Sequence, residues 1–352
     1  MRASFWIRPA ILLASAAPVL ADGGAQHQVK QTPPVKMGTS GGSVADHSSL
    51  YCCGGTLGCL VRRDGVLSIL SNNHVLARSG SAATGEDTLQ PGLIDSNCSG
   101  TTSNIVGDFA GNLVPLGSAN VDVGLSTARA NVDSSGSILD IGVPCTTVQA
   151  PTIGLAVMKS GRTTGFTTGS ITSINTTVTV QYQKGCAQGK KFNVTFTNQI
   201  VTGAMSAGGD SGSLLLSNDG SANPVGLLFA GSASATVYNR AQDVVNAFSA
   251  GGHTFSFVGV SCATTEGRGN VDETPSEREI EAAMRVQSEN EFDLFRNPNV
   301  LGVGIGAAED NPLEAVLVVY VESTNEHPFR TLPTEIDGVR VRVILTDRIV
   351  AQ

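Results

Sequence analysis

The chain has 352 residues, a formal net charge of −8, 15% charged residues, 5% aromatic residues and 41 glycines. It is too long for one small domain and long enough for two. No run of lysine or arginine supplies the basic surface that nucleic-acid binding needs, so nucleic acid is not expected as a partner.

The first 21 residues have the pattern of a secretory signal peptide. Arg2 and Arg8 form a basic start, an apolar run follows over residues 9–20, and Val19-Leu20-Ala21 offers a cleavage site. The apolar run is shorter than the ~20 residues of a membrane-spanning helix. The pattern predicts a secreted or periplasmic protein without a stable membrane anchor.

Residues 22–45 are rich in Gly, Gln, Pro, Ser and Thr, and we predict a flexible leader there. From 46 to 262 the chain consists of short β-type runs broken by Gly, Asn, Asp and Ser, which is typical of an all-β barrel or sandwich. Helical spacing predicts one short helix at 241–248. The strand predictions are residues 57–61, 66–70, 171–180, 191–196, 213–216 and 225–229.

A second unit is predicted at 275–352, after a linker at 263–274. Thr274-Pro275-Ser276-Glu277 has the pattern of a helix start, with Thr274 as N-cap, and predicts a helix over 275–291. Strand-like runs follow, and Asp337-Gly338 predicts a turn before the last of them. A helix followed by a small sheet indicates an α+β domain. The predicted strands are 300–305, 315–321 and 339–345.

Export makes the cysteines candidates for disulfide bonds. There are seven, so at least one is unpaired within a monomer, and the sequence alone does not fix the pairing. Cys52 and Cys59 flank five residues and could close a small loop. The spacing lacks a second CxxC or a HxxxH partner, so no zinc site is predicted.

Gly208-Gly209-Asp210-Ser211-Gly212 has the composition of a nucleophile loop. A serine hydroxyl needs a base that takes its proton and donors that face the oxyanion formed on the attacked carbonyl. The glycines allow a sharp turn that aims the N–H groups of Gly209 and Ser211 at one point. A glycine-rich hairpin turn without chemistry is the alternative for this segment alone.

Two further segments offer the base and the residue that orients it. Asn72-Asn73-His74-Val75 follows an apolar run, so His74 would stand at the end of a buried strand. Asn120-Val121-Asp122 leads into the apolar run 123–125, where Asp122 could lie buried beside a histidine. Asp108 and Asp133 are the competing carboxylates, but neither precedes such a run.

These three segments, in the order His, Asp, Ser, resemble those of chymotrypsin- and trypsin-like serine proteases over residues 46–262. The histidine segment is closest to the form in the high-temperature-requirement proteases. Residues 159–169 are similar to the beginning of the second barrel in a secreted bacterial subgroup that also resembles the plant narrow-leaf proteins. The resemblance implies a double six-stranded β-barrel and a serine endopeptidase with His74, Asp122 and Ser211 as triad and no cofactor.

The resemblance also implies where peptide substrates would bind. Residues 225–232 look like the strand that pairs with extended substrate, which makes Ala230, Gly231 and Ser232 candidates. Met205 stands where trypsins carry an aspartate at the pocket base, so apolar or small side chains are expected at the cleaved residue. Asn73 replaces the alanine of animal trypsins, and no activation site is evident whose new N-terminus would pair with Asp210.

Two other functions remain open from the sequence. The barrel could be an inactive relative that only binds peptides or proteins, although the complete set of His74, Asp122 and Ser211 argues against it. An esterase is disfavoured by the His-Asp-Ser order. The unit at 275–352 carries no catalytic set, and we hypothesise that it covers or regulates the protease or gathers substrate. Oligomeric state is not predicted.

Overall fold

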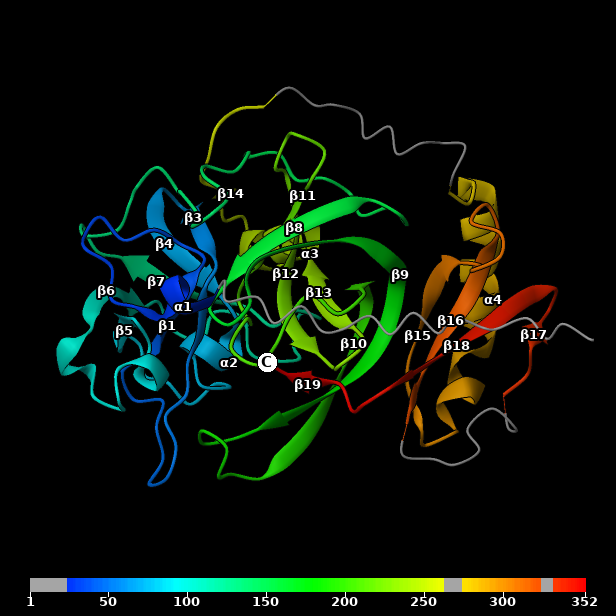
Figure 1. The fold of residues 1–352 in the computed structure, drawn as a ribbon, viewed down its shortest axis with the longest axis horizontal. Coiled ribbons are helices and arrows are strands. Elements are labelled where there is room, and N and C mark those ends of the chain that lie inside the picture. Colours follow the sequence, from blue (N-terminus) through cyan, green and yellow to red (C-terminus); the bar gives the residue numbers. More distant parts are fainter. Residues whose placement is uncertain (1–23, 263–273, 324–331) are drawn as a thin grey trace, which may run out of the picture.

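The structure, a computed structural model, describes residues 24–262, 274–323 and 332–352. Two β-barrels lie side by side, and a unit of one helix and several strands lies against the second barrel (Figure 1). The predicted signal peptide and all but one residue of the predicted linker lie outside the described residues.

The first barrel is a closed ring of antiparallel pairs. β1 pairs with β2 and β5, and the ladder continues through β6, β7 and β4 to β3. β2 and β3 are one run interrupted at Gly58, so the ring has six members. β14, Phe255–Phe257, extends it beside β3. The strands are β1 Thr39–Ser43, β2 Gly55–Leu57, β3 Cys59–Arg63, β4 Val66–Ser71, β5 Asp87–Gln90, β6 Asn104–Phe109 and β7 Gly124–Ala128.

The second barrel closes in the same way. Successive antiparallel pairs join β8, β9, β10, β13, β12 and β11, and β11 returns to β8. The predicted all-β, double six-stranded architecture is therefore confirmed. The strands are β8 Ala156–Gly161, β9 Gly165–Gln183, β10 Lys191–Thr202, β11 Leu214–Ser217, β12 Pro224–Gly231 and β13 Thr236–Arg240.

Few helices accompany the barrels. α3, Ala241–Ser249, is the helix predicted at 241–248, and it buries Val244 and Phe248 in the core of the first barrel. This contact ties the end of the second barrel to the first through apolar burial. The other helical segments are short: α1 Ala25–Gln28, α2 Asn73–Leu76 and two 3₁₀ turns at Leu93–Asp95 and Gly100–Thr102.

The predicted flexible leader is wrong for residues 24–45. His27 is buried and bonds through its ring nitrogens to Gly38 O at 2.6 Å and Asp140 Oδ2 at 2.8 Å. Val35 and Met37 are fully buried in the core of the first barrel, and β1 is one of its strands. The polar composition misled because these residues are held by hydrogen bonds and strand pairing more than by apolar side chains.

The C-terminal unit contains the predicted helix and strands, but its sheet is not separate. β15 pairs antiparallel with the stretch of β9 beyond the end of β8, so the sheet of the second barrel runs on through β16 and β18. The turn predicted at Asp337-Gly338 links β17 to β18. The elements are α4 Glu277–Phe295, β15 Val300–Ala307, β16 Ala315–Glu322, β17 Glu335–Ile336, β18 Val339–Thr346 and β19 Val350–Ala351.

The start of α4 lies two residues later than predicted. Ser276, and not Thr274, is the N-cap, because its hydroxyl accepts from the Glu279 N–H while the Glu279 carboxylate accepts from the Ser276 N–H. The helix then buries Ala283, Val286 and other residues against β15 and β16.

Three disulfides join segments far apart in the chain, which confirms the prediction of disulfide bonding. They link Cys52 to Cys98, Cys53 to Cys186 and Cys145 to Cys262. The suggested loop between Cys52 and Cys59 is wrong, since Cys59 is the free, buried cysteine on β3. Cys53–Cys186 connects the two barrels.

We expect Ser276→Ala to lower the free energy of unfolding of the C-terminal unit by about 1 kcal/mol, because it removes the hydroxyl that accepts from the Glu279 N–H. Urea unfolding followed by circular dichroism measures this. Ser288→Ala, in the exposed middle of the same helix, is the matched control and should leave stability unchanged or slightly raised. Equal effects of the two substitutions would contradict the capping role.

Candidate active site

His74 lies on the one-turn helix α2, directly after β4. The buried strand delivers the helix between the two barrels, and Asn73 holds it there. The Asn73 amide donates to Asn112 Oδ1 at 2.8 Å and to Val114 O at 3.0 Å. This is the role of the asparagine that departs from the animal trypsin pattern.

Asp122 is completely buried, and its carboxylate accepts four hydrogen bonds. Oδ2 accepts from His74 Nδ1 at 2.6 Å and from the Tyr182 hydroxyl at 2.8 Å. Oδ1 accepts from the backbone N–H groups of Asn73 at 2.7 Å and His74 at 3.2 Å. A buried charge needs such partners to be tolerable. The same bonds fix the histidine ring, since Nδ1 must carry a proton and Nε2 is left to act as base.

Tyr182 was not found from the sequence. It lies on β9 of the second barrel, while Asp122 belongs to the first, so only the packing of the barrels brings the two together. Burial and then the charge of Asp122 raise the pKa of Tyr182 well above its usual value. The hydroxyl therefore stays protonated and donates to the carboxylate.

The pKa of His74 is raised above its usual value of 6.5. Burial of the ring alone would lower it. The charge of Asp122, the hydrogen bond to that carboxylate and a contact with Gln352 O at 3.2 Å outweigh burial. The site thus stabilises an imidazolium, which a general base becomes when it takes a proton.

Ser211 lies close to this pair but does not bond to His74 directly. Its hydroxyl donates to Phe229 O at 3.2 Å and accepts from Gln352 N at 3.1 Å. His74 Nε2 contacts the carbonyl oxygen of the same residue, Gln352. The nucleophile and the base candidates therefore converge on one backbone unit.

The loop before and after Ser211 depends on two glycines with positive φ. Gly209 has φ +98° and Gly212 has φ +97°. A Cβ on Gly212 would collide with Ser71 Oγ and Thr56 O, and one on Gly209 would come within 2.6 Å of Thr163 Oγ1. Within the described part of the chain, no group accepts from the N–H of Gly209 or Ser211. Both N–H groups are free to bind an oxyanion.

Asp210 anchors this loop through a buried ion pair with Lys159 at 3.3 Å, and both side chains are fully buried. Its carboxylate also accepts from the N–H groups of Thr163, Thr164 and Ala207. Burial lowers the pKa of Lys159, and the charge of Asp210 opposes that shift. The cation beside Asp210 is therefore the Lys159 side chain. The sequence showed no activation site whose new N-terminus could take that place.

The predicted substrate residues divide into two groups. Ala230 and Gly231 on β12 form the edge with which β19 pairs, and Ser232 follows them with its hydroxyl bonded to Thr346. Met205 packs instead into the apolar core of the second barrel, with its sulfur 3.8 Å from the Tyr238 hydroxyl. The neighbouring Ser206 points the other way and contacts the side chain of Gln352 at 2.5 Å.

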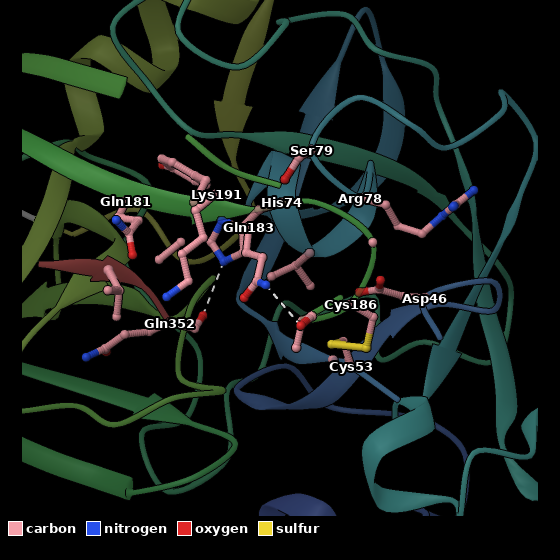
Figure 2. A pocket seen from close by; sticks show the side chains of 17 residues that line it. Asp46, Cys53, His74, Arg78, Ser79, Gln181, Gln183, Cys186, Lys191 and Gln352 are labelled. Carbon is pink, nitrogen blue, oxygen red and sulfur yellow. Dashed lines mark hydrogen bonds between the residues drawn. A yellow bond between two sulfur atoms is a disulfide. The ribbon is translucent and has the colours of Figure 1, made fainter. Parts of the chain in front are cut away.

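An open cleft of about 370 Å³ lies beside His74. Figure 2 shows His74 and Gln352 joined across it, with Lys191 and Gln183 on one wall and the Cys53–Cys186 disulfide at the far end. The wall contains residues from both barrels and from β19. Asp46, Cys53 and Cys186 cluster there, but the two sulfurs are bonded to each other and are not metal ligands.

The competing carboxylates have other partners. Asp108 pairs with Arg129 at 2.6 Å near the surface, and Asp133 bonds to Ser135 within a turn. Neither contacts His74, so Asp122 is the carboxylate that the structure brings to the imidazole.

No protein-family model and no curated protein matches the chain. Among solved structures it is similar to a glutamic-acid-specific serine protease, with 20% identity, 63% of this chain and 100% of that chain covered, and a TM-score of 0.44. Thermobifida fusca protease A has 21% identity, coverage of 64% and 99%, and a TM-score of 0.42. Cellulomonas bogoriensis chymotrypsin has 20% identity, coverage of 58% and 91%, and a TM-score of 0.37.

These are bacterial chymotrypsin-like serine proteases, the group that the sequence motifs resemble.

We expect Lys159→Met to destabilise the protein by about 3–5 kcal/mol, because it leaves the buried charge of Asp210 without its counter-ion. The double variant Lys159→Met, Asp210→Asn removes both charges and should recover part of that loss. Urea unfolding measures both free energies. A double variant no more stable than the single one would show that the unpaired charge is not the cause.

We expect Asp122→Asn to lower the rate of reaction of Ser211 with an acylating substrate by about 10⁴-fold, since an asparagine no longer selects the required histidine tautomer. Asp108→Asn is the control and should react like the unchanged chain. The reverse ranking of the two variants would transfer the orienting role to Asp108.

The rate should also rise with pH through the pKa of His74, because only the neutral imidazole accepts a proton. With that pKa raised, the midpoint should lie above 6.5. In terms of stability the sign is opposite: the His74–Asp122 attraction contributes fully below 6.5 and is lost as pH rises through the folded-state pKa. A pH–rate profile of kcat/KM measures the midpoint, and one at or below 6.5 would contradict the assignment.

Proposed function

We propose that the protein is a serine endopeptidase that acts outside the cytoplasm, with Ser211 as nucleophile, His74 as general base and Asp122 as the residue that orients the base. One observation carries the proposal. His74 bonds to the buried Asp122 through Nδ1, while its Nε2 and the Ser211 hydroxyl contact the same extended backbone residue. A peptide placed there would have its carbonyl carbon beside the hydroxyl.

The proposed reaction begins with a rotation of the Ser211 side chain from Phe229 O towards His74, a change between staggered rotamers. Ser211 Oγ then bonds to the substrate carbonyl carbon and its proton passes to His74 Nε2. The carbonyl electron pair moves onto oxygen, where the N–H groups of Gly209 and Ser211 bind it. Loss of one such donor typically costs on the order of 10²–10³ in rate.

The carbon–nitrogen bond then breaks as His74 returns the proton to the leaving amine, which gives an acyl-enzyme. Water attacks the ester in the same manner, with His74 as base again, and releases the acid and the free hydroxyl. The proposed steps need no metal and no organic cofactor. The protease domain is the segment 46–262, extended at its start by β1 and the buried residues before it.

Three disulfides support a location outside the reducing cytoplasm, secreted or periplasmic, in agreement with the signal-peptide pattern. In the described ranges, no helix has the length and apolar character needed to cross a bilayer. Protein or peptide substrates are the proposed partners.

A fluorophosphonate probe separates this function from an inactive, peptide-binding barrel, because it reacts only with an activated serine. We expect labelling of Ser211, identified by mass spectrometry, and no labelling of Ser211→Ala. Ser213→Ala, two residues away, is the control and should be labelled. Absence of labelling in the chain at every pH from 5 to 10, in all variants and after removal of β19, would leave the binding-only alternative.

A further inference from the structure

β19 brings the end of the described chain back from the C-terminal unit to the proposed active site (Figure 1). It pairs antiparallel with β12, with Ala351 opposite Ala230 and Val350 opposite Gly231. On its other side Gln181 N of β9 donates to Ile349 O at 3.0 Å. The segment therefore lies as an added strand between two edges of the second barrel.

Ile349 anchors the segment. Its side chain is almost fully buried in the apolar cluster that also contains Phe229 and Ala230. The preceding Thr346 contacts Ser232, and the Arg348–Glu322 pair fixes the turn on the exposed side at 2.8 Å. These contacts pre-order the three residues that follow.

Gln352 contacts both the proposed nucleophile and the proposed base. Its N–H lies 3.1 Å from Ser211 Oγ and 3.3 Å from Phe229 O, and its carbonyl oxygen lies 3.2 Å from His74 Nε2. Its side-chain Oε1 accepts from the Ser206 hydroxyl at 2.5 Å, and Ser206 is in turn bonded to Thr236.

The Gln352 side chain fits its pocket because Gly231 has no Cβ. A Cβ on Gly231 would lie 2.8 Å from Gln352 Cδ and closer still to its Nε2. A hydroxyl donor on one side and a bare glycine on the other fit an uncharged carboxamide. The pocket thus suits a glutamine side chain, whereas Met205 led us to expect an apolar or small side chain at the cleaved residue.

Extended peptides bind to sheet edges through backbone hydrogen bonds, with pockets for alternate side chains. Val350-Ala351-Gln352 has this arrangement, and it places Gln352 beside the proposed nucleophile. We propose that this segment is an intramolecular ligand that occupies the substrate cleft in the place of a peptide, and that the cleft takes substrates with glutamine at the corresponding position. The inference rests on the proposed function, because it takes Ser211 and His74 as the reacting groups.

A covalently tethered strand has an effective concentration in the millimolar range, so it competes with free substrate at all times. The apparent affinity for substrate falls by the fraction of molecules in which the cleft is open. Cleavage would then depend on displacement of β19 by a substrate that binds more tightly, or on its withdrawal with the C-terminal unit.

The test compares the rate of fluorophosphonate labelling of the full chain with that of a variant lacking Val350, Ala351 and Gln352. Ile349 is kept so that the apolar anchor remains. We expect labelling to be faster by about tenfold or more without the segment. Gln352→Ala should be faster than the full chain, and Ser288→Ala, which changes the exposed middle of α4 and leaves β19 and its anchoring contacts intact, should label like the full chain. If the deletion variant does not unfold cooperatively, the labelling rates of the two point variants are compared with that of the full chain instead.

A second arm does not need catalysis. Binding of the peptide acetyl-Val-Ala-Gln-amide is measured by calorimetry on Ser211→Ala proteins with and without residues 350–352, with acetyl-Val-Ala-Lys-amide as the control. We expect the glutamine peptide to bind only when the segment is absent, and the lysine peptide to bind at least tenfold more weakly.

The two arms separate the two claims. Equal labelling rates with and without the segment would overturn the occupancy while leaving Ser211 active. Peptide binding that needs the deletion, with no labelling of any variant, would uphold the occupancy and overturn the protease function. If no variant is labelled and no peptide binds, both claims are overturned.

Discussion

The buried carboxylate of Asp122 is the constraint on which the site depends. A charge with no solvent contact requires donors from several directions, and here they come from α2 and from β9 of the other barrel. Satisfying that charge fixes the orientation of His74 and the distance between the barrels at once. The same hydrogen bonds to Asp122 therefore stabilise the fold and orient His74 as the base.

A second buried charge has the same effect on the nucleophile loop. Lys159 and Asp210 pair without solvent, and the backbone N–H groups around them are drawn to the carboxylate. The loop is thereby held with two glycines in left-handed backbone conformation. Within the described residues, the N–H groups of Gly209 and Ser211 have no acceptor. Preorganised donors of this kind cost no rearrangement when charge develops on a substrate. The cleft itself is lined in part by β19, so the C-terminal unit forms part of the site as well as extending the sheet.

The sequence predicted the barrels and pointed to His74, Asp122 and Ser211 as a candidate site, because both leave local signals. Short runs between glycine-rich turns indicate strands. The segment around His74 follows a strand, and those around Asp122 and Ser211 precede one. The roles of Tyr182, Lys159 and Ser206 depend on contacts between residues distant in the chain, which no local pattern records. The prediction of a flexible leader was wrong because a polar composition indicates only that a segment has few apolar side chains to bury. His27 and β1 are held by hydrogen bonds instead. Met205 packs into the core of the second barrel, and its place in the motif does not determine which way its side chain points.

The tautomer of His74 tests the central claim most directly. Nitrogen-15 NMR of ring-labelled protein lacking residues 350–352, in which Gln352 O no longer faces Nε2, distinguishes a protonated Nδ1 from a protonated Nε2 at a pH above the pKa of His74. We expect the proton on Nδ1, hydrogen-bonded to Asp122, with Nε2 free to accept the proton of Ser211. A neutral ring protonated on Nε2, or a mixture of the two forms as in free histidine, would contradict it.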